Sequence, residues 1–228
     1  MFQLKQLTFL SFVFTLLFVG CVPTTTEDSV SSTQYIINRV PASLRQGDTE
    51  DMVTVLVDEM VISVQRPPSW ESVSTDYGVV LAEKMSTFAD LGHDGLIAHI
   101  FVPPLDNIVL AEDSDNVARS ILRQVIARPE YINGAITTTP MAFEWQSLDA
   151  AYFLMDNRRG SATVIIGLAE PVNNKLAVVQ VSAPSAEAER IRMLLPEVLD
   201  RMTINNIELS GSVLDSILPA MLKFPEMD

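Results

Sequence analysis

The sequence predicts an α+β domain with a largely antiparallel sheet that helices cover on both faces. Three strand-like segments, Leu148–Met155, Ser161–Ala169 and Leu176–Ala183, follow one another with short links, which favours an antiparallel meander. The middle segment is apolar at consecutive positions, so both of its faces need cover. Two segments with apolar residues at helical spacing, Asp115–Ala127 and Ala186–Met202, are available to provide that cover.

The first 21 residues have the pattern of a bacterial lipoprotein signal. Lys5 precedes an apolar run from Leu7 to Phe18, which has the length of a secretory core and is shorter than the ~20 residues that span a bilayer. Val19-Gly20-Cys21 matches a lipobox. We expect residues 1–20 to be a signal peptide, Cys21 to carry lipid, and the protein to lie on the extracytoplasmic face of the cell membrane. An uncleaved N-terminal anchor is the alternative.

Residues 21–51 are predicted to be the lipidated cysteine and a flexible tether, followed by a single domain at 52–228. The tether opens with a polar run, Thr24 to Ser29, that cannot offset the entropy cost of its own ordering. The formal net charge is −14, which disfavours nucleic acid and anionic headgroups as partners. Cys21 is the only cysteine, so we expect neither a disulfide nor a thiolate metal site.

Short β-branched runs from Met52 onward predict the first strands of the domain. A proline pair, Pro67-Pro68, ends the second of these strands, since proline cannot donate to a ladder. A later sequence, Asn173-Asn174, suits a tight hairpin between the last two strands of the meander. The early strands are expected at Val53–Val57, Val61–Val64, Val79–Ala82 and Leu96–Val102.

The ends of the helices are indicated by capping and proline residues. Ser114 or Asp113 is expected to cap the first helix, and Pro129 to stop it. Pro196 lies inside the second helix and should kink or split it. A short strand and a weak terminal helix complete the expected elements, at Ile204–Leu209 and Val213–Leu222.

Val61–Ala82 and Ala142–Met202 together resemble the PsbP-like family. The resemblance rests on a strand that ends in Pro67-Pro68-Ser69-Trp70, a strand led by Gly78, and the late meander followed by a helix. This family includes an extrinsic photosystem II subunit, a eukaryotic Ran-binding import factor and many bacterial lipoproteins. The resemblance implies an αβα sandwich, but it implies no activity, because the family has no single one.

Residues with catalytic or metal-binding potential are few. The sequence contains no nucleophile elbow, zinc-protease helix, phosphate loop or dinucleotide fingerprint. His93 and His99 are spaced poorly for one metal. His99 shares a strand face with apolar residues and is expected to be a half-buried, hydrogen-bonded core histidine, whereas His93 is a turn residue or a base beside Asp94.

Other candidate residues have a structural and a functional interpretation. The acidic residues Asp106, Glu112, Asp113 and Asp115 lack the calcium-loop spacing, so capping and solvation explain them better. Trp70 and Trp145 are expected in the core, with a ligand cleft as the alternative. Arg158 and Arg159 at a hairpin tip are either exposed turn residues or a partner contact.

The combined pattern favours a lipid-anchored extracytoplasmic binding or scaffold domain that contacts an envelope or membrane protein. No catalytic residue, metal or cofactor is predicted. The alternative is an envelope enzyme that uses Asp or Glu side chains around His93.

Overall fold

The structure is a computed structural model. It describes residues 45–46, 52–84, 86–87, 94–105, 108, 115–128, 132, 134–157, 160–170, 175–219 and 222–225. These residues belong to one compact unit that spans 31–228. In chain order, the elements that form it are β1 (Arg45–Gln46), β2 (Met52–Val57), β3 (Met60–Gln65), β4 (Glu71–Thr75), β5 (Gly78–Ala82), β6 (Ile97–Phe101), α4 (Val117–Ile126), β7 (Ile136–Thr137), β8 (Met141–Trp145), β9 (Leu148–Asn157), β10 (Ser161–Glu170), β11 (Lys175–Pro184), the 3₁₀ turn η1 (Ser185–Glu187), α6 (Glu189–Leu199), β12 (Met202–Ile204), β13 (Ile207–Glu208) and α7 (Ser212–Ile217).

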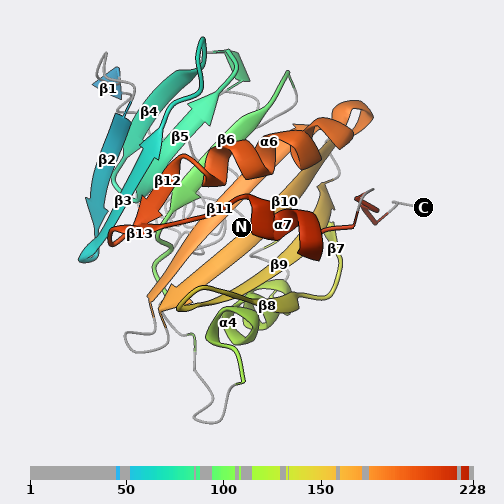
Figure 1. Ribbon diagram of the computed structural model, residues 1–228. Coiled ribbons are helices and arrows are strands. Elements are labelled where there is room, and N and C mark those ends of the chain that lie inside the picture. The colour runs from blue at the N-terminus through green and yellow to red at the C-terminus, as the bar shows by residue number, and fades with distance from the viewer. Residues whose placement is uncertain are drawn as a thin grey trace, which may run out of the picture. The chain divides into compact units, whose positions relative to one another are not determined.

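A large antiparallel sheet forms the body of the unit (Figure 1). Its strand order is β1-β4-β5-β6-β11-β10-β9-β7, and β8 also pairs with β9. The predicted meander is confirmed, since β10 pairs with β9 and with β11, both antiparallel. Nine of the ten residues of β10 are buried, which also confirms that its two faces are covered.

A second, smaller antiparallel sheet has the order β13-β12-β3-β2. It joins segments that are far apart in sequence, because Met202 of β12 pairs with Val64 of β3. The sheet packs on one end of the large sheet, where β2 contacts β4 and β5. Met60, Ile62 and other buried residues of this sheet belong to the main hydrophobic core.

The main core lies between one face of the large sheet and the layer formed by α6, α7 and the small sheet. Alternate residues of β10, such as Val164 and Ile166, point into it. The buried stripe of α6 packs on the same core, and Figure 1 shows this helix crossing β10 and β11. The apolar residues at helical spacing therefore have the role that the sequence predicts for them.

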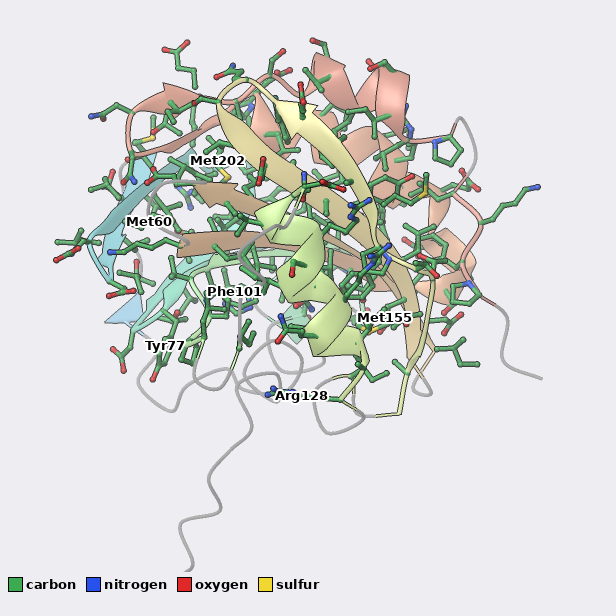
Figure 2. All side chains as sticks on the ribbon, turned by 90° about the horizontal axis from the view of Figure 1, so that it is seen from below. Met60, Tyr77, Phe101, Arg128, Met155 and Met202 are labelled. Atoms are coloured by element: carbon green, nitrogen blue, oxygen red, sulfur yellow. The ribbon has the colours of Figure 1, made fainter. Side chains whose placement is uncertain are left out.

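Helix α4 lies on the opposite face of the large sheet. Ile121 and Leu122 pack with Ile165, which points to the other side of β10 from Val164. Figure 2 shows α4 in front of the strands, in a view that labels Phe101 and Met155 of the same apolar cluster. The helix contacts β8, β9 and β10.

The helical cover of the sheet is therefore only partly as expected. On the first face, the small sheet shares the covering role with α6, because β2 contacts β4 and β5. The fold is α+β and dominated by its sheets. The difference arises because β12 and β13 take up residues that the sequence assigns to a helix end and a single strand.

The cap of α4 differs from the expected one. Asn116, and not Ser114 or Asp113, is the N-cap, and its side chain accepts a hydrogen bond from the Arg119 backbone N–H at 2.8 Å. The Asn116 amide also donates to the Ala150 carbonyl of β9 at 3.1 Å. The helix starts here because one residue both caps it and attaches it to the sheet.

Two further features concern the predicted helix end and the predicted tether. Pro196 lies inside α6, which continues through it as one element and is not split. Strand β1 falls within the range 21–51 that is predicted to be a tether, and its Arg45 pairs with Ser74 of β4. The rest of that range and the predicted signal peptide lie outside the described residues.

Candidate functional site

A polar cleft of about 560 Å³ lies where the connection between β5 and β6 meets the start of α6. Its volume is in the range of small-molecule and side-chain pockets. Five of its lining residues are charged, three of them carboxylates and two of them cations. The lining consists of Ser69, Trp70, Glu83, Lys84, Asp94, Gly95, Pro184, Glu187 and Arg190.

Arg190 connects two walls of the cleft. Its Nη1 donates to Glu187 Oε2, and its Nη2 donates to Glu83 Oε1. These hydrogen bonds raise the pKa of the Arg190 guanidinium above its ordinary value, and the bond to Glu187 has a larger effect than the bond to Glu83. The arginine is therefore a fixed cation that holds the first turn of α6 against the end of β5.

Glu83 is held at both of its carboxylate oxygens. Oε1 accepts from Arg190, and Oε2 accepts from the backbone N–H of Leu96 at 3.0 Å. A Cβ on Gly95, which has a φ of +126°, would lie 3.0 Å from the same Oε2. Glycine is thus required both by the backbone conformation and by the position of the Glu83 carboxylate.

Asp94 and Lys84 form the exposed rim of the cleft. Their charged atoms are 3.8 Å apart, and their side chains are 57% and 62% exposed respectively. Ser86 Oγ donates to Asp94 Oδ2 at 3.2 Å. Because an exposed pair at this distance contributes little to stability, the Asp94 carboxylate is available to other partners.

A turn before β4 carries Trp70 into the cleft. The Trp70 backbone N–H donates to the Pro67 carbonyl at 3.1 Å, and Ser69 between them has a φ of +65°. Pro68 and a positive φ at the next residue fit a type II turn, where glycine is the usual residue. Trp70 is half-buried, since it packs partly against the main core and partly lines the cleft.

The two tryptophans, for which the sequence left two interpretations, have different roles. Trp145 is fully buried in the main core, as expected. Trp70 combines features of both interpretations, because it packs partly against the main core and also lines the cleft. The motif that carries the family resemblance, Pro67-Pro68-Ser69-Trp70, is therefore also the local sequence signal that points to the cleft.

A buried polar group lies on the α4 side of the large sheet, away from the cleft. His99 stacks on Phe101 with ring centroids 4.3 Å apart, and Gln180 of β11 pairs with it across the sheet. The ring as a whole is half-buried, but its Nε2 is buried and has no hydrogen-bond partner, like Gln180 Oε1. Burial lowers the pKa of His99 to about 4. His99 is a neutral, half-buried histidine of the sheet, as the sequence predicts, but the hydrogen bond expected for it is not made at Nε2 by any residue that the structure describes.

Several predicted site residues cannot be placed. Cys21, His93, Arg158 and Arg159 lie outside the described residues, as do Asp106, Glu112 and Asp113 of the acidic group. Asp115, the remaining member of that group, is exposed and 3.7 Å from Arg119. Asp94, the neighbour of His93, lines the cleft.

Within the described ranges, no cluster of three or more His, Cys, Asp or Glu side chains is suited to hold a metal ion. Among the helices that the structure describes, none is long and apolar enough to cross a membrane.

The comparisons with known proteins concern the fold. No protein-family model matches the chain, and no curated protein matches it. The chain is similar to the solution structure of cyanobacterial PsbP (CyanoP) from Synechocystis sp. PCC 6803, with a TM-score of 0.43 and 12% sequence identity. The match covers 71% of this chain and 97% of that chain.

Proposed function

We propose that the protein is a lipid-anchored extracytoplasmic domain that binds or scaffolds an envelope or membrane protein. The cleft is the observation that carries the binding role, because it is an open site with fixed polar groups and one part-exposed aromatic ring. The lipobox and the polar run after it support the anchoring role.

The groups in the cleft favour binding over catalysis. Glu83 uses both of its oxygens, and Arg190 is paired with two carboxylates. Such mutually occupied groups give the cleft a fixed shape, whereas a general base has to be free to take a proton from its substrate.

An envelope enzyme remains the second candidate because Asp94, next to His93 in sequence, lines the cleft together with Glu83 and Glu187. The two functions differ in turnover. If the second candidate is correct, a substrate is consumed and Asp94→Asn abolishes its turnover while the chain still folds. A binding domain consumes nothing.

Replacing Cys21 by Ser is expected to abolish stable membrane association. The wild-type protein should stay with membranes in high salt, because its negative charge is repelled by anionic headgroups and acyl chains alone hold it. The Cys21→Ser chain should appear as a soluble or uncleaved product. Fractionation and mass spectrometry of the mature N-terminus check this. An unmodified Cys21, or processing at another site, would rule out the lipid anchor.

A photoreactive phenylalanine analogue in place of Lys84 is expected to crosslink the protein to its partner in intact cells. Lys84 is 62% exposed and lies at the cleft. The control places the same group at Glu144, an exposed residue of β8 outside the cleft. A product of one defined mass from position 84 and none from position 144 supports the proposal. Equal products from both positions contradict the cleft as the contact.

Arg158 and Arg159 stay a second proposed contact, to be tested in the same way.

A further inference from the structure

The charges of the described residues that line the cleft do not balance. Glu83, Asp94 and Glu187 carry three formal negative charges, and Lys84 and Arg190 carry two positive ones. One negative charge is therefore left over, in a chain whose net charge is already −14. A ligand with one positive charge complements this site, whereas a phosphate or a carboxylate would add to the excess of negative charge.

The excess charge is placed where a ligand can reach it. Glu83 is saturated, but Glu187 is 46% exposed and only its Oε2 is bound, by Arg190. Asp94 is 57% exposed, and its Oδ1 has only the distant Lys84 ammonium as a partner. The two carboxylates thus keep acceptor capacity for a charge-assisted hydrogen bond.

The apolar part of the cleft suits the stem of a long cationic side chain. Trp70 is part-exposed and lies in the same lining as Pro184. A cation over an indole face is attracted by the electrons of the ring, and the methylene groups of lysine or arginine pack on such surfaces. The indole and the carboxylates together match both ends of such a side chain.

We propose that the cleft receives one lysine or arginine side chain of the partner protein. This inference rests on the proposed binding function and names the chemistry of its partner. The positive charge lies between Asp94 and Glu187, and the stem lies against Trp70. Arg190 holds Glu83 and Glu187 in place and does not itself bind the partner's charge.

The test uses the full chain in mild detergent and measures the solvent exposure of Trp70 by quenching of its fluorescence. Trp145 is fully buried, so acrylamide should quench mainly the emission of Trp70. The probe is a capped heptapeptide with one arginine among glycine and serine residues. The control peptide has citrulline, the uncharged isostere of arginine, at that position. We expect the arginine peptide to protect Trp70 from quenching with a Kd of roughly 1–10 mM, and the citrulline peptide to give no protection.

Charge variants separate the cleft from the general attraction of an acidic protein. Glu187→Gln and Asp94→Asn should each weaken protection roughly two- to fivefold, the effect of one exposed charge pair. Glu144→Gln changes the net charge equally at an exposed site outside the cleft and should leave the Kd within about twofold. Both cleft positions are exposed, and a thermal melt verifies that each variant is folded.

Three outcomes would overturn the inference. Equal protection by the citrulline peptide would mean that the cleft takes an uncharged ligand. Equal loss in all three variants would mean that only the net charge matters. No protection at roughly 20 mM peptide would mean that the cleft does not take this side chain. None of these results alters the Cys21 and crosslinking experiments, which do not depend on the charge of the occupant and so test the proposed function separately.

Discussion

Leu195→Asp is expected to leave the protein unfolded at 25 °C. Leu195 of α6 is fully buried in the main core between this helix and the large sheet. Removal of a buried leucine side chain costs about 2–5 kcal/mol through lost burial and the cavity it leaves, and an unpaired charge in its place costs several more. The sum is comparable with the 5–15 kcal/mol that stabilises a typical domain. Far-ultraviolet circular dichroism and urea denaturation measure the loss.

Met193→Asp is the matched control for this experiment. Met193 lies on the same helix, two residues away, but it is 71% exposed. Surface substitutions of this kind usually change stability by no more than about 0.5 kcal/mol. If Leu195→Asp melts within a few degrees of the wild type, or if Met193→Asp is the more harmful change, the assigned packing face of α6 is wrong.

The meander was predictable because its information is local. Strands β9, β10 and β11 follow one another in sequence, and each pairs with the next. The apolar residues of β10 at consecutive positions, such as Val164 and Ile165, pack into cores on opposite faces. A pattern within one segment was therefore enough to give both the pairing and the central position.

Elements that depend on distant partners were missed or misjudged. Strand β4 has only one aliphatic residue, Val73, in its five positions, so its sequence lacks a strand signal. It forms a strand because β5 pairs with it along its whole length. Likewise Met202, expected to end a helix, belongs to β12 because Val64 of β3 pairs with it from far away in the sequence. Tertiary pairing outweighed the local pattern in both cases.

The cleft depends on the same long-range organisation. Glu83 and Arg190 are far apart in sequence. They meet because the strands that precede them, β5 and β11, both pair with β6 in the large sheet. Spacing rules for catalytic or metal motifs cannot detect such a pair. The local signals in the sequence were Trp70 after the proline pair and Gly95, which has a positive φ in the structure. Neither residue indicates which charged side chains lie next to it.

Acidification between pH 6.5 and about 4 is expected to lower the free energy of unfolding through His99 by roughly 3 kcal/mol. Burial lowers the pKa of His99 to about 4 in the folded protein, from about 6.5 in the unfolded chain. The contribution is fully present above pH 6.5, where both states hold a neutral ring. It is lost as the pH falls, because the unfolded state takes up the proton first.

The control for this pH dependence is His99→Gln, which cannot take up that proton. Urea denaturation of both proteins across this pH range gives their difference in unfolding free energy, in which the carboxylates common to both cancel. One of these, Asp156, has a pKa raised by burial and therefore acts in the opposite direction in both chains. We expect the wild type to lose stability relative to His99→Gln as the pH falls, and the difference to level off below pH 4. A constant difference would mean that Nε2 of His99 accepts protons in the folded state as readily as in the unfolded one, and that it is not buried as described.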